Sequence, residues 1–315
     1  MKNQFPLLWR GLGRGLFFML LLTPKHWKDY ELIDCGNFEK LERFGKYILS
    51  RPEPQALWNK KMSEAEWKKL YNAKYVREKG RDGILLNTEK GRWITKSNMP
   101  ENWFISYQYK EMNLQFRLAL TSFGHIGVFP EQAENWDYIY DCLLPNKNQK
   151  PKVLNLFAYT GGASLAACSA GAEVVHVDSV KQTINWSNLN KEASGLDGIR
   201  WVVEDAMKFV KREVKRGNKY SGIIMDPPAY GRGPDGEKWV LETGINELVK
   251  LCSEMFLDDH SFFIINLYSM GLSAQILQNL ISCYFPLTNS EMGELFIPSK
   301  TGYNLPLGTF LRFKK

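Results

Sequence analysis

Strand-like and helix-like segments alternate along the chain from about residue 150 onward, and this alternation constrains the fold more than any other feature. Apolar runs predict strands over 152–157, 173–178, 200–204, 220–226 and 261–267. Helical patterns follow them over 161–170, 180–193, 206–215, 241–256 and 272–283. Repeated β–α units require parallel strands with right-handed crossovers. Two antiparallel strands are expected last, over 287–296 and 305–313. The sequence therefore predicts an α/β fold with a doubly wound, Rossmann-like, seven-stranded and mostly parallel sheet that carries an antiparallel C-terminal strand.

The preceding region has a different pattern, of short strands and turns. Ser63-Glu-Ala-Glu66 is typical of a capping box that opens a short helix. Turn residues at 80–83 and 89–91 lead into apolar runs at 84–86 and 92–95, which predicts a hairpin. Alternating runs over 104–109 and 114–120 predict two half-buried strands. We expect a small α+β domain over 28–124, followed by the larger α/β domain over 125–315.

Composition places the chain among globular proteins. Of its 315 residues, 44% are hydrophobic and 24% are charged, which excludes disordered, collagen-like and multi-span membrane proteins. The longest apolar run, at 16–22, is far shorter than the roughly 20 residues that cross a bilayer. Arg10 and Arg14 precede this run as in a secretory signal, but residues 23–26 lack a small-residue cleavage pattern. Residues 1–27 are therefore an uncertain extension, interpreted as a buried segment or as a stretch upstream of an initiator at Met19.

Cysteine and histidine are sparse and scattered. The five cysteines lie far apart without any C-x-x-C, and there are four histidines. This pattern argues against a disulfide framework and against a metal site, and it favours a reducing cytoplasm. No metal is expected.

Charge is distributed unevenly. Residues 1–125 carry a net charge of +9 and six of the ten tryptophans, whereas residues 126–315 carry −2. A basic, aromatic-rich segment favours an anionic polymer as partner, because Lys and Arg displace counterions from phosphates. A solvated basic surface without a partner is the alternative interpretation.

The first segment that could bind a ligand spans the end of the strand over 152–157 and the turn after it. It reads Asn155-Leu-Phe-Ala-Tyr-Thr-Gly-Gly162. Its glycines permit a tight turn and a close backbone approach, and the next helix N-terminus favours a carboxylate or phosphate. It lacks G-x-G-x-x-G, so a dinucleotide pyrophosphate fits poorly. A plain strand–helix turn is the alternative.

Three acids follow other strands of the predicted sheet. Asp178 ends its strand about 20 residues beyond the glycine turn, where an acid can accept hydrogen bonds from ribose hydroxyls. Asp205 is placed to meet an adenine edge, although either acid alone could be a helix N-cap. Asp226-Pro227-Pro228 forms a rigid loop whose carboxylate could accept hydrogen bonds from a base, with Tyr230 to stack on it. A Pro-rich turn is the alternative for this loop.

The order of Asn155–Gly162, Asp178, Asp205 and Asp226-Pro227-Pro228 resembles that of class I S-adenosylmethionine-dependent methyltransferases. More closely, it resembles the bacterial family related to the large-subunit ribosomal RNA methyltransferases I and K/L. The segment Phe123-Gly-His-Ile-Gly-Val-Phe-Pro-Glu-Gln132 is similar to the segment that precedes the sheet in that family. The similarity covers residues 120–315, and the N-terminal part more weakly.

The resemblance implies S-adenosylmethionine as cofactor and RNA, in particular ribosomal RNA, as partner. In it, Phe157–Gly162 would hold the methionine part, Asp178 the ribose, Asp205 and Ala206 the adenine, while Phe129 and Gln132 would border the cofactor from outside. The cofactor residues so implied are Phe129, Gln132, Asn155, Phe157, Ala158, Tyr159, Thr160, Gly161, Gly162, Asp178, Ser179, Asp205 and Ala206. The catalytic residues implied are Asp226, Pro227, Pro228 and Tyr230.

Two departures from that family matter. Residues 1–125 do not show the PUA-type RNA-binding domain of the methyltransferase I branch. Transfer to cytosine C5 needs a thiolate to activate the ring, and that branch places Cys after the fifth strand, where this chain has Ile264-Ile-Asn-Leu-Tyr-Ser-Met270. Cys252 and Cys283 fall in predicted helices and are expected in the core. Transfer to nitrogen is therefore favoured.

Other functions stay open at this stage. The same fold could methylate a protein or a small molecule, and a non-catalytic RNA-binding module is a further alternative. A nicotinamide dehydrogenase fits least, because the dinucleotide fingerprint is missing. The sequence indicates nothing about oligomeric state.

Overall fold

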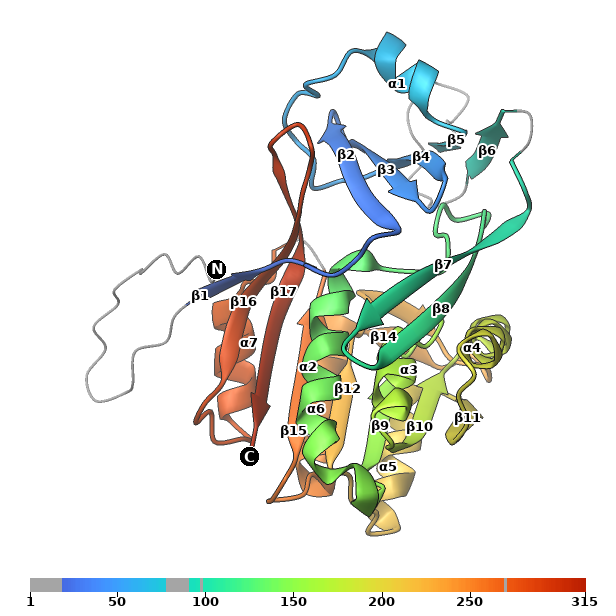
Figure 1. Cartoon of the computed structure of the whole chain (residues 1–315). Helices are drawn as coiled ribbons and strands as arrows, with labels where there is room; N and C mark the ends of the chain where they lie inside the picture. Colours follow the sequence, from blue (N-terminus) through green and yellow to red (C-terminus); the bar gives the residue numbers. More distant parts are fainter. Residues whose placement is uncertain (1–18, 78–90, 97–98, 269–270) are drawn as a thin grey trace. The chain divides into compact units, whose positions relative to one another are not determined.

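The computed structural model describes residues 19–77, 91–96, 99–268 and 271–315. The chain divides into two compact units (Figure 1). Unit 1 comprises the described residues up to Thr23 together with Gln132–Leu295 and Leu307–Lys315. Unit 2 comprises Pro24–Glu131 and Phe296–Pro306.

Unit 1 is built on an eight-stranded sheet in the order β1-β16-β17-β15-β12-β9-β10-β11. β15, β12, β9, β10 and β11 are parallel neighbours, and β17 is antiparallel to β15. The predicted doubly wound sheet with an antiparallel C-terminal strand is confirmed. The strands are β1 (Met19–Leu22), β9 (Lys152–Leu156), β10 (Glu173–Asp178), β11 (Ile199–Val203), β12 (Gly222–Met225), β15 (Phe262–Leu267), β16 (Glu291–Pro298) and β17 (Asn304–Lys314).

The eighth strand comes from a segment that the sequence left uncertain. β1 pairs in parallel with β16, with Met19 opposite Met292 and Leu22 opposite Leu295. Its side chains are half-buried or exposed, as expected at a sheet edge. Residues 16–18 of the same apolar run lie outside the described residues.

Helices cover both faces of the sheet of unit 1. α2 packs on α3 on one face, and side chains of α5, α6 and α7 share a core with the other face. α4 contacts β10 and β11. The helices are α2 (Ala133–Leu143), α3 (Gly162–Ser169), α4 (Lys181–Ala193), α5 (Ala206–Lys215), α6 (Leu241–Met255) and α7 (Ala274–Ser282), with 3-10 turns η1 (Pro130–Gln132) and η2 (Leu144–Gln149). A short hairpin joins β13 (Tyr230–Arg232) to β14 (Lys238–Val240).

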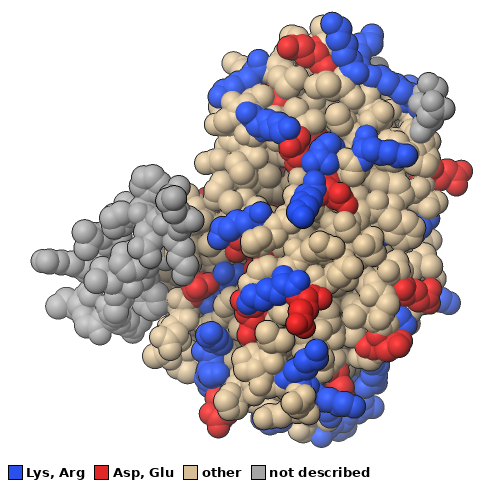
Figure 2. Space-filling model, viewed as in Figure 1, with Lys and Arg blue, Asp and Glu red and all other residues tan. Residues whose placement is uncertain are grey.

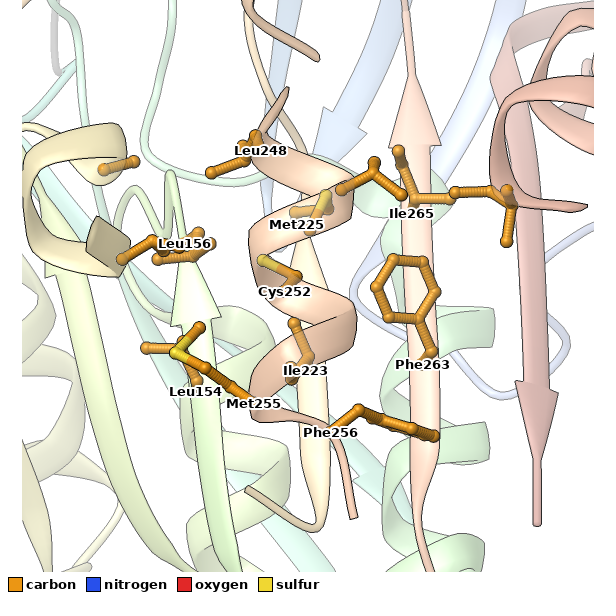
Figure 3. Close-up of a cluster of buried hydrophobic side chains, with 14 of the residues drawn as sticks. Leu154, Leu156, Ile223, Met225, Leu248, Cys252, Met255, Phe256, Phe263 and Ile265 are labelled. Carbon is orange, nitrogen blue, oxygen red and sulfur yellow. The ribbon is translucent and has the colours of Figure 1, made fainter. Parts of the chain in front are cut away.

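The central strands are mostly apolar because both of their faces are covered. Every residue of β12 and β15 is buried, as is usual for parallel strands between two helical layers. Figure 3 shows Leu154 and Leu156 of β9, Met225 of β12 and Ile265 of β15 gathered around Cys252 of α6. This cluster fixes the ends of the strands that carry the polar residues.

The strand order reverses at β9, which lies between β10 and β12. The chain continues from β9 to β10 and β11 on one side, and then returns to β12 and β15 on the other. Because these strands are parallel, their carboxyl ends meet at one edge of the sheet. In open α/β sheets this edge, at the reversal, is where ligands bind.

Unit 2 contains a five-stranded sheet in the order β2-β3-β4-β5-β6 and a separate β7–β8 hairpin. The predicted capping box is present at α1, with the Ser63 hydroxyl bound to the Glu66 backbone and the Glu66 carboxylate bound to the Ser63 backbone. The predicted strands over 104–109 and 114–120 are confirmed as β7 and β8. The elements are β2 (Tyr30–Gly36), β3 (Glu39–Phe44), β4 (Tyr47–Pro52), α1 (Glu64–Leu70), β5 (Ala73–Arg77), β6 (Gly91–Thr95), β7 (Asn102–Tyr109) and β8 (Met112–Ala119).

The predicted hairpin around residues 80–95 is only partly visible. Its second strand corresponds to β6, which pairs antiparallel with β5. The first run, at 84–86, lies outside the described residues.

Within the described ranges, none of the helices is both long and apolar enough to span a bilayer.

Candidate active site

The turn after β9 has an unusual backbone. Phe157 and Tyr159 have φ of 54° and 50°, and Gly161 has φ of 93°. Non-glycine residues rarely adopt this left-handed region, at a cost of roughly 1–3 kcal/mol each. Such strain persists only where the surroundings impose it, and it is common at ligand sites.

Hydrogen bonds from α4 hold the turn in this shape. The Ser187 hydroxyl donates to the Tyr159 carbonyl at 2.8 Å, and the Asn190 amide donates to the Thr160 carbonyl at 2.9 Å. Both donors are fully buried. Sequence reasoning missed them, because only the fold brings α4 against the turn. A Cβ added to Gly161 would lie 3.3 Å from Cβ of Ser187, so the glycine also permits this close packing.

Asn155 supports the turn from inside the sheet. It is buried, and its amide donates to the Ser164 hydroxyl at 2.9 Å, which in turn lies 2.9 Å from Nδ1 of His176. Burial lowers the pKa of His176 to about 3, so the ring is neutral. The Asn155 side chain thus contacts α3 and β10, and its predicted part in cofactor binding stays a prediction.

Asp178 ends β10 beside the turn. Its Oδ2 accepts from the Tyr159 amide at 2.9 Å, and its Oδ1 accepts from the Val180 amide at 2.9 Å and the Thr183 hydroxyl at 2.8 Å. Burial raises the pKa of Asp178 above its usual range, and these three hydrogen bonds oppose the rise only in part. The carboxylate therefore ties the turn to α4, while Ser179 next to it is half-buried.

Asp205 follows β11 and is the N-cap of α5, accepting from the Lys208 amide at 2.9 Å through Oδ1. The alternative role foreseen for it, a helix cap, is thus confirmed. Since a carboxylate has about four acceptor sites, this bond leaves Asp205 able to accept others. Ala206 is buried at the first position of the helix.

Asp226 follows β12 and is half-buried. The Gln132 amide donates to its Oδ2 at 3.1 Å. Burial raises the pKa of Asp226 to about 6. The structure brings Gln132 to the acid of the rigid loop, and its predicted place beside the cofactor stays a prediction.

The loop beyond Asp226 is held by one tryptophan. The indole of Trp239 on β14 donates to the Pro228 carbonyl at 2.7 Å, and its ring centroid lies 4.9 Å from that of Phe157. It therefore connects the loop after β12 with the turn after β9. Pro227 is buried, whereas Tyr230 is 71% exposed. Trp239 was not singled out from the sequence, because its partners are distant along the chain.

A cavity of about 490 Å³ opens at the same side of unit 1. Asp205, Lys208, Lys238 and Trp239 contribute to its lining. Its volume is in the range of small-ligand sites. Of the predicted site residues only Asp205 lines it, so Asp178 and Asp226 lie outside this cavity.

Phe129 belongs to unit 2, where its ring lies edge-on to His125 at 5.5 Å between centroids, and it is 37% exposed. Its predicted contact with the cofactor stays a prediction.

The two cysteines expected in the core, Cys252 and Cys283, differ in their burial. Cys252 is fully buried on α6, which raises the pKa of its thiol, as expected for a core residue. The expectation for Cys283 is wrong, because this residue is exposed at the end of α7. The described part of the chain contains no group of three or more His, Cys, Asp and Glu residues that could hold a metal ion.

The acceptors collected at this edge suit a nucleoside with an amino acid tail. Such a ligand presents ribose hydroxyls, an adenine amine and an ammonium group, all of which donate hydrogen bonds. Asp178 and Asp205 supply carboxylates, and the turn over 157–161 lies beside Asp178 with two non-glycine residues at positive φ. The residues present thus fit S-adenosylmethionine.

Comparison with known proteins agrees with this geometry. The family described as S-adenosylmethionine-dependent methyltransferase matches residues 78–265, which is more than half of the chain. The chain belongs to this family. It is an enzyme that uses S-adenosylmethionine as methyl donor.

One solved structure and two curated proteins are similar to this chain. This methyltransferase is similar to the crystal structure of the SAM-dependent methyltransferase from Agrobacterium tumefaciens, with a TM-score of 0.83 and 34% identity over 98% of this chain and 99% of that one. Two curated relatives are ribosomal RNA large subunit methyltransferase K/L of Shewanella frigidimarina, 32% identical over 124 residues, and ribosomal RNA large subunit methyltransferase I of Photobacterium profundum, 39% identical over 82 residues. These matches cover 38% and 25% of this chain, but only 16% and 21% of the two relatives.

Proposed function

We propose that this methyltransferase transfers a methyl group to a nitrogen of a base in ribosomal RNA. The observation that carries the proposal is the loop after β12. A half-buried carboxylate is followed by two prolines and, four residues on, by an exposed aromatic ring. A flipped base can stack on Tyr230 while its amino group donates to Asp226. The names of the curated relatives support ribosomal RNA as the substrate class.

The residues around the turn would hold the cofactor. Asp178 would accept from the ribose hydroxyls, Asp205 with Ala206 would contact the adenine, and Phe157–Gly162 would hold the methionine part. When bound, S-adenosylmethionine supplies an electrophilic methyl carbon that a nitrogen can attack in line. The protein's task is then to align the nitrogen and to exclude water.

Asp226 would orient the nitrogen that is methylated. With a pKa of about 6, its carboxylate is mostly ionised at neutral pH and can accept an amino hydrogen. The carbonyls of Pro228 and Ala229 already accept from the Trp239 indole and the Leu241 amide. Of the loop groups proposed to contact the base, Asp226 and the Pro227 carbonyl are therefore the main acceptors for its amino hydrogens. No strong general base is required, because the nitrogen becomes acidic as the new bond forms.

Nitrogen is favoured over cytosine C5 because no suitable thiol accompanies the loop. β15 and the residue that follows it, Tyr268, contain no cysteine, and Cys283 lies at the exposed end of α7. Cys252 is enclosed in the core with a raised thiol pKa, which suppresses the thiolate needed for attack on C6.

Unit 2 supplies features suited to RNA, and we propose residues 28–124 as an RNA-binding domain and residues 125–315 as the methyltransferase domain. Phe104 and Phe123 are each 52% exposed, and exposed aromatic rings can stack on bases. Figure 2 shows the described Lys and Arg side chains interspersed with Asp and Glu on the face in view. We therefore expect RNA affinity to depend moderately on salt. Action on ribosomal RNA would place the enzyme in the cytoplasm.

The test uses S-adenosylmethionine labelled in its methyl group. The purified enzyme is incubated with ribosomal RNA, with ribosomal subunits and with total protein, and Asp226→Asn serves as the inactive control. Label in RNA, found in a nitrogen-methylated nucleoside by mass spectrometry, supports the proposal. Label in protein alone, or in 5-methylcytosine, contradicts it.

A second experiment identifies the nucleotide. Ribosomal RNA from a deletion strain is mapped by mass, and one missing methyl group is expected. Restoration by the wild-type gene but not by the Asp226→Asn gene would tie the loss to this site.

A further inference from the structure

Asp226 stands at the end of a chain of hydrogen bonds that crosses the interior of unit 1. The Gln132 amide donates to Asp226 Oδ2 at 3.1 Å. Gln132 Oε1 itself accepts from Asn135 Nδ2 on α2 at 3.0 Å and from Asn266 Nδ2 on β15 at 3.1 Å. Asn135 Nδ2 also donates to Asn266 Oδ1 at 3.0 Å. Three amides are thus joined to one acid.

The other end of the chain is a guanidinium. Arg312 on β17 donates from Nη1 to Asn135 Oδ1 at 3.2 Å and to the Glu134 carbonyl at 3.1 Å. Its Nε donates to Glu291 Oε2 at 2.9 Å, and its charge lies 4.2 Å from the centre of the Tyr138 ring. Arg312 is 5% exposed, so its position is fixed on several sides.

The two ends determine which way each amide faces. A guanidinium can only donate, and an ionised carboxylate can only accept. Arg312 therefore requires the Asn135 oxygen to face it, which turns the Asn135 amino group toward Gln132 and Asn266. Gln132 must then accept with its oxygen and present its own amino group to Asp226. Reversing any amide would place two donors or two acceptors in contact.

We propose that Asn135, Asn266 and Arg312 are positioning residues that act through Gln132 to hold the Asp226 carboxylate, in its accepting form, toward the substrate. The inference rests on the proposed role of Asp226 and extends it to residues that do not touch the substrate. Asn135 and Asn266 are 2% and 4% exposed, so water does not replace their bonds readily. Asn135 is the central link, because it connects Arg312 to both other amides.

The alternative is that the same bonds merely join α2 to the sheet. A structural role of this kind lowers stability when the chain is broken, but it does not change the titration of Asp226. Burial is the cause of the raised pKa of Asp226 among the described residues, and the Gln132 amide favours the ionised form. Loss of that donor must therefore raise the pKa further.

The test measures the titration of Asp226 directly by NMR of the full chain with carbon-13-labelled aspartate carboxyls, with Asp226→Asn to assign the signal. Gln132→Leu is expected to raise the pKa of Asp226 by about one pH unit, and Asn135→Leu by about half of that. In the Gln132→Leu background, Asn135→Leu is expected to leave the pKa of Asp226 unchanged, because the hydrogen bonds that connect Asn135 to Asp226 pass through Gln132. Asn266→Leu provides a second variant of the same kind.

Thr309→Val is the matched control, because it removes a buried polar group on β17 whose hydroxyl donates to the Leu267 carbonyl and not to the chain of hydrogen bonds. The inference is overturned if the pKa of Asp226 is unchanged in Asn135→Leu and Asn266→Leu. It is also overturned if Asn135→Leu shifts the pKa of Asp226 equally in the wild type and in the Gln132→Leu variant. The NMR titration requires no substrate, so it decides the question even if ribosomal RNA proves to be the wrong substrate. Where methyl transfer is measurable, Asn135→Leu should lower kcat at pH 7 at least twofold and leave the Kd for S-adenosylmethionine unchanged.

Discussion

The Asp178→Ala variant tests two roles of this carboxylate. The carboxylate stabilises the turn after β9 through hydrogen bonds, and it is proposed to accept hydrogen bonds from the ribose. The three hydrogen bonds to Asp178, at 2.8–2.9 Å, come from Tyr159, Val180 and Thr183. At about 1 kcal/mol each, their loss would cost about 3 kcal/mol of unfolding free energy. Burial raises the pKa of Asp178, however, so the fold already disfavours its ionised form. We therefore expect a net loss of only ~1–2 kcal/mol, and a fall in Tm of ~3–6 °C.

The expected loss of cofactor affinity is larger. A carboxylate has about four acceptor sites, of which three are used in the structure. One ribose hydroxyl can therefore bind directly, and a second can bind if the Thr183 hydroxyl turns to the Val180 carbonyl, which it already reaches at 2.7 Å. Two such bonds to a charged acceptor are together worth ~3–4 kcal/mol, or a rise in Kd of ~150–700-fold.

Isothermal titration calorimetry with S-adenosylmethionine measures this change, with circular dichroism to verify the fold of the variant. Thr183→Val is the control, since it removes one donor to Asp178 and keeps the carboxylate, and its Kd should change less than about fivefold. A folded Asp178→Ala protein whose Kd stays within fivefold of the wild type would refute the ribose role and leave Asp178 as a tie for the turn alone.

Four further predictions concern other parts of the site. Methyl transfer should fall as the pH decreases through about 6, the pKa of Asp226, because the protonated carboxyl no longer accepts an amino hydrogen, and a pH–rate profile measures this. Asp226→Asn should abolish transfer yet leave the calorimetric Kd for S-adenosylmethionine within a few-fold, and an equal loss of both would contradict the division of roles with Asp178. Gly162→Ala should lower the unfolding free energy by ~1–3 kcal/mol in a denaturation experiment, because the new Cβ would lie 2.4 Å from the Trp136 ring. Trp239→Phe keeps a ring but removes the hydrogen bond to the Pro228 carbonyl, so KM for the RNA substrate should rise more than the Kd for the cofactor; a change in the cofactor Kd alone would argue against a role in the loop.

The sheet was predictable because its central strands are apolar on both faces and end in turn residues. The run at 261–267 and the prolines after Met225 mark strand ends without any tertiary information. β1 was not predictable, because four apolar residues acquire strand structure only by pairing with β16, some 270 residues later. The acids at the strand ends could be placed together from topology alone, since parallel strands bring their carboxyl ends to one edge.

The residues that hold the turns beside those acids were not predictable. Ser187, Asn190 and Trp239 act on backbone atoms of the turns, and their sequence neighbourhoods carry no motif. The expectation for Cys283 failed for a related reason, because free cysteine is usually buried but the end of α7 is exposed. Local pattern indicates which strand end holds an acid, whereas the packing of distant helices decides what that acid can do.

Asp178 and Asp226 show this difference most clearly. Both follow a parallel strand at the same edge of the sheet, and burial raises the pKa of both. Asp178 accepts three hydrogen bonds from its own surroundings, two of them from backbone amides, so its carboxylate is fixed and has little capacity left. Asp226 accepts one side-chain bond, from an amide whose orientation is imposed by Arg312 through Asn135. A fixed acid suits a ligand that docks in one pose, and an acid with spare acceptor sites suits a group that arrives, reacts and leaves. The number of donors that each already has therefore supports the proposed assignment of the cofactor to Asp178 and of the substrate to Asp226.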